Sequence, residues 1–348
     1  MIKKDIDLDF TLKKLKEYLS ISSPCGYTKT ASLNLKNDFE SFGLKTSFTK
    51  KGALIATLEG ENTKEEVAIS AHIDTLGGMI KEINPDGTLR FHKIGGGVYN
   101  SLEGENCTII SKHNILYRGS VVPKKRSIHV YGIEGLSVPR DEFSMIIRLD
   151  EEVSCKQDIL ALGISVGDFV AMDTRFETTK NGFIKSRYLD NKSSVAIVLE
   201  VCRLLNKLHL RPKYTTHFII SNFEEQGHGL SYIPPKTKEL LAMDIGPIGE
   251  GQTSNEHSVT IAAKDKKTVY DYDFRCKLED ICKKHNINYV VDVFNNYSSD
   301  ASQAILRGLD ISFACIGPGV DATHHYERTH KDSIENTILL ILFYLIND

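Results

Sequence analysis

The chain has 348 residues, of which 41% are hydrophobic and 26% are charged, and its formal net charge is -3. This length suffices for two domains or one large one, and the composition is ordinary for a soluble globular protein. A charge balance this close to zero gives no reason to expect a nucleic acid or an anionic membrane surface as a partner.

The cysteines and the two ends of the chain bear on its location. The seven cysteines include no C-x-x-C pair, which argues against a disulfide framework and for a reducing compartment. The N-terminal residues MIKKDIDLDF lack the apolar segment of a signal peptide. The longest apolar run, 338–346, is about half of the ~20 residues that a membrane span needs. We therefore expect a cytoplasmic protein with no membrane partner.

The first part of the chain alternates between helical and extended patterns. Leucines four or three residues apart predict an amphipathic helix over 5–20, and a second helix is expected over 29–42. Residues 45–49 and 53–59 alternate enough to form paired strands. The helices and strands that we expect here belong to an α/β unit.

A short apolar run, Val67-Ala68-Ile69, opens the segment VAISAHIDTLGG and predicts a buried strand. His72 and Asp74 follow at the carboxyl end of this strand, and their spacing of two residues places them on one face of an extended segment. His72 is a natural metal ligand, and Asp74 is well placed to accept its second imidazole N–H.

The pattern then changes twice. Residues 75–172 contain short alternating strands and many turn residues, which predicts a small β-barrel domain inserted into the α/β unit. Strand and helix alternate again over 173–348. The expected fold class is therefore α/β, with a mostly parallel sheet, helices on both faces and an inserted β-barrel. The catalytic domain would comprise 1–74 and 173–348.

Polar residues recur where the later strands end or helices begin. Asp190 precedes a helix, Glu224-Glu225 follow a strand, Asp244 ends the next strand, and His330 precedes the last helix. The carboxyl ends of parallel strands border the ligand crevice of such a sheet. Together with the histidine at 72, these residues form a nitrogen and oxygen donor set that suits zinc, cobalt or manganese, including a pair of ions bridged by one carboxylate.

Each position also has an ordinary structural explanation. Asp190 could cap a helix, Glu224-Glu225 could be a solvated pair, Asp244 could be a turn acid, and His330 could cap the last helix. The metal hypothesis is favoured because all of these explanations would have to hold together. His324-His325 are weaker candidates, since adjacent side chains point in different directions.

Five motifs carry a resemblance to a known family. The segments AHIDTLG, LDNKSS, FEEQGHG, AMDIG and ERTHKDS occur in this order. In this respect the chain resembles the glutamyl aminopeptidase/FrvX-type family of dinuclear metallo-aminopeptidases, which includes the tetrahedral aminopeptidases. The likeness covers nearly the whole chain, including the inserted β domain. It implies a zinc aminopeptidase-like fold and removal of N-terminal residues from peptides.

The resemblance also implies a ligand set for two divalent ions, usually zinc or cobalt. His72 and Asp244 would hold one ion. Glu225 and His330 would hold the other, and Asp190 would bridge both. Many family members carry H-S-P where this chain has ERTH followed by Lys331-Asp332, so the histidine at 324 remains a rival for the last ligand.

Two further roles follow from the same resemblance. Glu224 would be the general base that takes a proton from the metal-bridged water, and Asp74 would orient the first histidine ligand. The inserted domain would mediate dimer contacts and border the route of the substrate, and family members often build homo-oligomers up to dodecamers.

Two alternative functions are open. One is a second enzyme that would use the same residues, and the other is a protein without catalytic activity. A deacylase of small N-acyl amino acid-type compounds would use the same ligands on a small amide substrate. A catalytically silent assembly protein would be marked by lost ligands, whereas every expected position is filled. We therefore expect a metallo-aminopeptidase.

Overall fold

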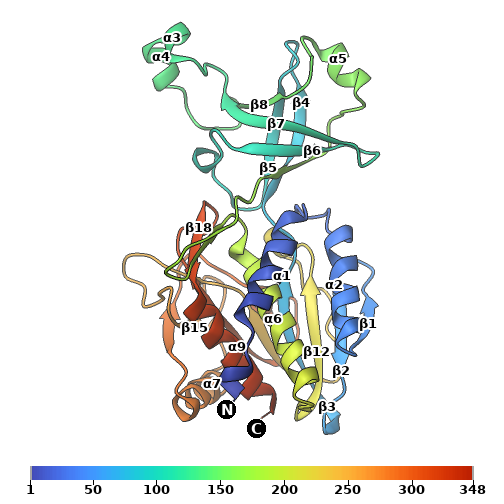
Figure 1. Cartoon of the computed structure of the whole chain (residues 1–348), viewed down its shortest axis with the longest axis vertical. Coiled ribbons are helices and arrows are strands. Elements are labelled where there is room, and N and C mark those ends of the chain that lie inside the picture. Colours follow the sequence, from blue (N-terminus) through green and yellow to red (C-terminus); the bar gives the residue numbers. More distant parts are fainter. Residues whose placement is uncertain (1, 347–348) are drawn as a thin grey trace. The chain divides into compact units, whose positions relative to one another are not determined.

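The computed structural model describes residues 2–346 and divides into two compact units. The first comprises the described part of Met1–Asp74 together with Arg175–Asp348, and the second is the insert Thr75–Thr174 (Figure 1). The sequence-based boundaries of the insert were 75 and 172.

The first unit is built around a nine-stranded sheet. In sheet order its main strands are β1 (Lys45–Phe48), β2 (Leu54–Leu58), β12 (Tyr214–Ser221), β3 (Asn62–His72), β13 (Thr237–Met243), β17 (Ser312–Val320), β15 (Val259–Lys264) and β16 (Tyr289–Val293). The short strand β14 (Gly246–Pro247) pairs with the end of β17. The neighbours β12, β3, β13 and β17 are parallel, whereas β2 and β15 join this block in antiparallel pairs. The largely parallel sheet confirms the expected fold class.

Helices cover both faces of this sheet. They are α1 (Leu8–Ser20), α2 (Lys29–Ser41), α6 (Leu189–Lys207), α7 (Tyr272–His285), α8 (Asp300–Leu306) and α9 (Lys331–Ile346). Helix α6 packs against α1, α9 and strands β3 and β17, so its side chains from Leu189 to Cys202 are all buried. Helix α8 packs on a cluster that contains Ala68, Leu240 and Ala242. None of the helices described between residues 2 and 346 is long and apolar enough to cross a membrane.

A second, three-stranded sheet lies in the same unit and was not predicted. It consists of β10 (Glu177–Thr178), β11 (Phe183–Ser186) and β18 (Glu327–His330). The sequence of β18, ERTH, is entirely polar, so it carries no apolar alternation that would reveal a strand. Strands β11 and β18 pair antiparallel, with Phe183 opposite His330 and Ser186 opposite Glu327. Strand β15 was also missed in the sequence.

The insert is a closed antiparallel barrel, as expected. Around the barrel its strands are β4 (Gly77–Ile83), β5 (Leu89–Ile94), β8 (Met145–Leu149), β7 (Leu116–Pro123), β6 (Asn106–Ile110) and β9 (Phe169–Met172). Alternate side chains fill the interior, among them Phe91, Val121 and Ile147. Short helices α3 (Ile128–Tyr131), α4 (Ile133–Leu136) and α5 (Lys156–Ala161) lie in the loops between strands.

Candidate metal centre

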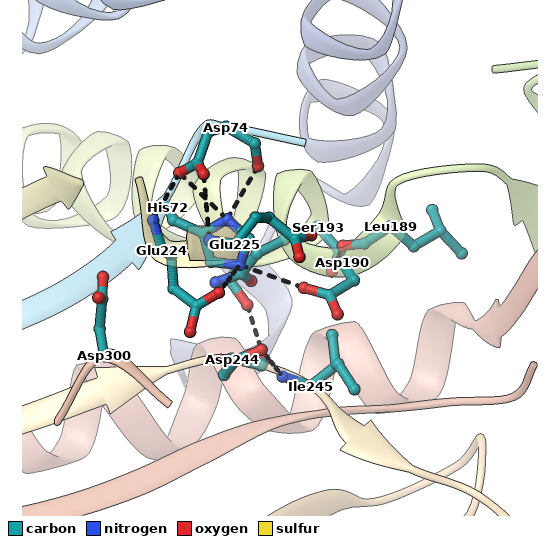
Figure 2. Close-up of polar contacts among 12 residues, drawn as sticks. His72, Asp74, Leu189, Asp190, Ser193, Glu224, Glu225, Asp244, Ile245 and Asp300 are labelled. Atoms are coloured by element: carbon teal, nitrogen blue, oxygen red, sulfur yellow. Dashed lines mark hydrogen bonds and ion pairs between the residues drawn. The ribbon is translucent and has the colours of Figure 1, made fainter. Parts of the chain in front are cut away.

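Polar side chains gather at the carboxyl ends of three adjacent parallel strands in the α/β unit. His72 is the last residue of β3, Asp244 follows β13, and Glu224 and Glu225 lie in a 3-10 turn after β12 (Figure 2). Asp190 lies at the start of α6, beside these strand ends. The parallel register brings together residues that are far apart in the sequence.

The first group of ligand atoms comes from His72, Asp190 and Asp244. One nitrogen or oxygen atom of each lies within 4.8 Å of the others, and all three side chains are buried. Nε2 of His72 is 3.2 Å from Oδ1 of Asp190, and Nδ1 is 2.9 Å from the backbone carbonyl of Asp74. The carbonyl only accepts, so Nδ1 carries a proton and Nε2 is free to bind a cation.

The second group consists of Asp190, Glu225 and His324. Nε2 of His324 is 3.5 Å from Oδ2 of Asp190 and 3.9 Å from Oε2 of Glu225. Asp190 therefore presents one carboxylate oxygen to each of two imidazoles, His72 and His324. We call the five residues of the two groups the candidate metal centre: His72, Asp190, Glu225, Asp244 and His324.

The residues present fit a pair of divalent ions. Oε1 of Glu225 is buried and has no hydrogen-bond partner among the described residues. Burial raises the pKa of Glu225 to about 7 and that of Asp244 well above its usual value. Burial opposes the ionised form of Asp190 as well, but His324 and His72 together hold its pKa below the usual range. Several carboxylates that share a dry site with two imidazoles need cations to remain ionised together.

Asp74 contacts the imidazole that it was predicted to orient, and it does so more closely through its main chain than through its carboxylate. Its carboxylate Oδ1 is 3.6 Å from Nδ1 of His72, and the shorter contact to that nitrogen is made by the Asp74 backbone carbonyl. The two carboxylate oxygens accept the backbone N–H groups of Glu224 and Glu225, each at 3.2 Å. Asp74 thus fixes the imidazole with its main chain and the glutamate pair with its side chain.

Glu224 lies beside the centre but belongs to neither group. Its Oε2 is 3.8 Å from Nε2 of His72, and its side chain is 12% exposed. Burial raises the pKa of Glu224 well above its usual value, against the opposing charge of His72. Glu224 therefore places a carboxyl with a raised pKa beside the ligand atoms of the first group.

His330 was expected in the second group, and the structure does not bring it there. In strand β18 alternate side chains point to opposite faces, so Glu327 and His330, three residues apart, face opposite ways. His330 instead packs its ring edge-on against Phe183, and its Nε2 is 2.7 Å from the carbonyl of Asn181. His324, considered less suitable from the sequence, occupies the place, while His325 is exposed.

Glu327 was missed as a site residue. Its Oε2 accepts the backbone N–H of Asp190 and its Oε1 accepts the backbone N–H of His324, both at 3.1 Å. Burial, reinforced by the charge of Asp190, raises the pKa of Glu327 to about 8. One carboxylate therefore holds two ligands of the second group. The ERTH motif, which begins with Glu327, was the sequence feature that could have pointed to this residue.

Asp300, the first residue of α8, also borders the centre (Figure 2). Its carboxylate accepts the hydroxyl of Ser221 and the backbone N–H of Leu230, the latter at 3.2 Å. A Cβ atom at Gly229 would lie 2.4 Å from Oδ1 of Asp300, so only glycine leaves room for this carboxylate. Asp300 therefore anchors the loop that carries the glutamate pair.

The LDNKSS segment is tied to the surrounding main chain. Nδ2 of Asn191 donates to the carbonyl of Met243 at 2.8 Å, and the hydroxyl of Ser194 donates to the carbonyl of Asp244 at 2.9 Å. The buried Lys192 donates to two carbonyls near the end of α1, and burial lowers its pKa to about 7. These bonds fix the start of α6, and with it Asp190.

Each of the three loops that carry these ligands contains a non-glycine residue with positive φ. The values are +65° at Tyr188, +82° at Phe223 and +64° at His324. Such conformations are uncommon for residues with a side chain and cluster at functional sites. The backbone of these loops is therefore unusual at the places where they present the candidate ligands.

The chain is similar to known peptidases over almost all of its length. A family model described as M42 glutamyl aminopeptidase matches residues 52–340. A Bacillus subtilis (strain 168) protein named as aminopeptidase YhfE is 45% identical over 336 residues, which cover 96% of this chain and 97% of that protein. Among solved structures, a TET aminopeptidase from Thaumarchaeota archaeon SCGC AB-539-E09 has a TM-score of 0.87 at 15% identity, covering 97% of both chains. The Pyrococcus horikoshii TET1 peptidase, described as able to form a tetrahedron or a large octahedral shell, has a TM-score of 0.83 at 20% identity and covers 97% of this chain and 100% of that one.

Proposed function

The chain belongs to the M42 glutamyl aminopeptidase family, and we propose that its aminopeptidase activity depends on two divalent metal ions held by the two groups that share Asp190. The observation that carries this proposal is the double-faced carboxylate of Asp190, which presents one oxygen to His72 and the other to His324. The unpartnered, buried Oε1 of Glu225 gives it further support.

Five residues would hold the ions. His72 and Asp244 serve one ion, Glu225 and His324 serve the other, and Asp190 serves both. The donor set of imidazole nitrogens and carboxylate oxygens, without a thiolate, favours zinc or cobalt. When bound, such a pair polarises the scissile carbonyl and lowers the pKa of a shared water.

The protein supplies the proton transfers and the orientation. Glu224 takes a proton from the attacking water and passes it to the leaving amine, a task suited to a carboxyl whose pKa is raised by burial. Asp74 holds the backbone of Glu224 in place through two N–H bonds to the glutamate pair. The surrounding low dielectric strengthens each of these interactions.

The acidic surroundings favour a substrate with a free α-amine. Carboxylates of Glu224, Glu225, Asp244 and Asp300 all lie at this edge of the sheet and attract a positive charge (Figure 2). A peptide bound by its ammonium group places its first peptide bond at the centre, which limits cleavage to N-terminal residues. The same ligands alone would also suit a deacylase.

A matched substrate panel tests this function. Aminoacyl p-nitroanilides and their N-acetylated counterparts are assayed with the chelated protein and after addition of zinc or cobalt. We expect turnover of the free amines alone, and only with metal. Faster cleavage of the acetylated compounds would replace the aminopeptidase proposal with the deacylase, and full activity after exhaustive chelation would remove the metals from it.

The insert offers a surface for homo-oligomer formation. Large apolar side chains near α3 and α4 are exposed, with Val130 at 73% and Ile133 at 83%. Contiguous exposed apolar residues are typical of protein–protein contacts. We expect Val130→Asp and Ile133→Asp to reduce the assembly measured by light scattering, whereas Leu306→Asp on α8 leaves it unchanged. An unaltered assembly in the first two variants would place the contacts elsewhere.

A cytoplasmic location fits the cysteines. All seven are free thiols, and several, such as Cys202 and Cys282, are buried. Free thiols persist in a reducing compartment. Cell fractionation of a tagged protein is the direct measurement, and recovery in the membrane or medium would contradict this location.

A further inference from the structure

A second set of imidazole and carboxylate groups lies outside the candidate metal centre. His257, His330 and Asp332 each contribute one ligand atom, and these atoms lie within 4.8 Å of one another. His257 comes from the segment before β15, His330 ends β18, and Asp332 is in the first turn of α9. We call these three residues the outer cluster.

Hydrogen bonds fix the tautomer of His330. Nε2 is 2.7 Å from the carbonyl oxygen of Asn181, which can only accept, so Nε2 carries a proton. Nδ1 accepts the backbone N–H of Asp332 at 3.2 Å. Nδ1 therefore carries no proton, and it lies 3.2 Å from Oδ2 of Asp332. A cation bound between these two atoms would take the place of the backbone N–H as the partner of the Nδ1 lone pair.

His257 completes the arrangement from the other side. Its Nδ1 is 3.0 Å from the same oxygen, Oδ2 of Asp332, and the two imidazole centroids are 4.4 Å apart. Phe183 contacts both rings edge-on. A Cβ atom at Gly182 would lie 2.6 Å from Nε2 of His330, so glycine makes room for the ring. The imidazole at 330 is thus held in one orientation before any ligand arrives.

We propose that the outer cluster binds a further divalent transition-metal ion, such as zinc, through Nδ1 of His257, Nδ1 of His330 and the Asp332 carboxylate. Two imidazoles and one carboxylate form a donor set of the borderline type that such ions favour. The side chains of His257 and Asp332 are 50% and 46% exposed, so a fourth position is open to water. The neighbouring positive charge of Arg328 is paired with Glu256 at 2.6 Å and does not face the cluster unbalanced.

An ion at this place would join three segments. It would connect the start of α9 and the end of β18 to the segment that precedes β15. Strand β18 begins with Glu327, the carboxylate that holds Asp190 and His324. The outer cluster lies at the opposite end of that strand and supplies no ligand to the centre.

Zinc content is the direct test. Wild type, His257→Ala and Asp332→Asn are dialysed against the same micromolar free zinc and analysed by elemental mass spectrometry. We expect both variants to bind about one zinc per chain less than wild type. The matched control is His92→Ala, which removes an exposed imidazole whose Nδ1 is 2.9 Å from a single carboxylate, Glu142. This control should keep the wild-type zinc content.

Two further measurements make every outcome decisive. Circular dichroism verifies the fold of each variant, and peptidase activity of His257→Ala should remain at the wild-type level, because the lost ion is not at the centre. Equal zinc in wild type and both outer-cluster variants would reduce the cluster to a hydrogen-bonded triad and overturn the proposal. A loss of zinc together with activity in His257→Ala would also overturn it, since the residue would then serve the centre.

A double variant tests the outer cluster independently of the proposed function. Adding His257→Ala to Asp190→Asn, which removes the shared carboxylate of the centre, should lower the zinc content by one further ion. This difference persists even if the centre itself binds no metal. If the double variant and Asp190→Asn bind equal amounts of zinc, the result contradicts the outer site and leaves the proposed function untouched.

Discussion

The candidate metal centre and the outer cluster are built from the same side-chain types, yet only one is suited to catalysis. In the centre, His72 and Asp244 are almost fully buried, and one carboxylate, Asp190, faces two imidazoles. In the outer cluster, His257 and Asp332 are about half exposed, and the carboxylate of Asp332 directs one oxygen to both rings. Donor chemistry alone therefore does not distinguish the two: the centre differs by its burial, its shared carboxylate and the neighbouring carboxyl of Glu224.

Glu224, the proposed general base, should give the largest effect. Glu224→Gln keeps the size of the side chain but cannot take up a proton near neutral pH, so turnover should fall by ~100- to 10,000-fold. Metal content should stay at the wild-type value, because Glu224 belongs to neither ligand group. The exposed carboxylate of Glu250 offers a control, and Glu250→Gln should retain full activity. Near-normal turnover in Glu224→Gln, or a loss of metal, would assign the base or the ligand differently within the pair.

Metal content and rate should separate His324 from His330, the two histidines that the sequence left as candidates for the last ligand. His324→Ala should lose about one metal ion from the centre, and its activity should fall by more than the ~10- to 100-fold typical of losing an outer hydrogen-bond partner. His330→Ala leaves a cavity where a buried ring was, but it should keep the metals of the centre. Any zinc that this variant loses should belong to the outer cluster. Metal content and rate are measured for both. Loss of the second centre ion in His330→Ala, with His324→Ala intact, would restore the original assignment.

The difficulty with these histidines shows where sequence patterns stop. His72, Glu225 and Asp244 follow clear apolar runs, and the carboxyl ends of parallel strands meet at one edge, so their convergence was predictable. The last ligand depends on a loop in which Ala322 and His324 have positive φ. No hydrophobic period encodes that conformation.

Most strands with an apolar pattern were predicted from the sequence, and a strand without one was missed. The barrel and the main sheet were expected because apolar residues alternate or cluster in their strands. The polar strand β18 was missed, and with it the reason that Glu327 and His330 face opposite ways. The role of Glu327 depends on two backbone N–H groups, and such contacts are visible only once the chain is folded.

A smaller effect is expected for Glu327, which touches the centre only through backbone groups. Glu327→Gln leaves one oxygen acceptor, so it can retain one of the two bonds to Asp190 and His324 and must present its amide N–H₂ to the other. We expect a ~10- to 100-fold loss of metal affinity or activity, the range typical of residues that support metal ligands. A competition titration with a chromophoric chelator measures the affinity, and unchanged affinity would limit Glu327 to a structural role.

The smallest effect should come from the outer cluster in the metal-free protein, and it completes the comparison. Without metal, His257→Ala removes a partly exposed imidazole–carboxylate contact of 3.0 Å together with ring contacts to Phe183 and His330. Exposed ion pairs of this kind stabilise proteins by roughly 0–1 kcal/mol. The melting temperature of the chelated variant should therefore stay within roughly 4 °C of chelated wild type.

Restoring metal should stabilise both proteins strongly, since ligand at 100 times its Kd contributes about 2.7 kcal/mol per site. The centre should account for most of this gain, because its ions would offset the charge of carboxylates such as Asp244, whose pKa is raised by burial. Scanning calorimetry of wild type and His257→Ala, each with chelator and with zinc, measures the four melting temperatures. A chelator effect confined to wild type would mean that the stabilising ion lies in the outer cluster, and the contrast between a buried centre and a solvated cluster would then be reversed.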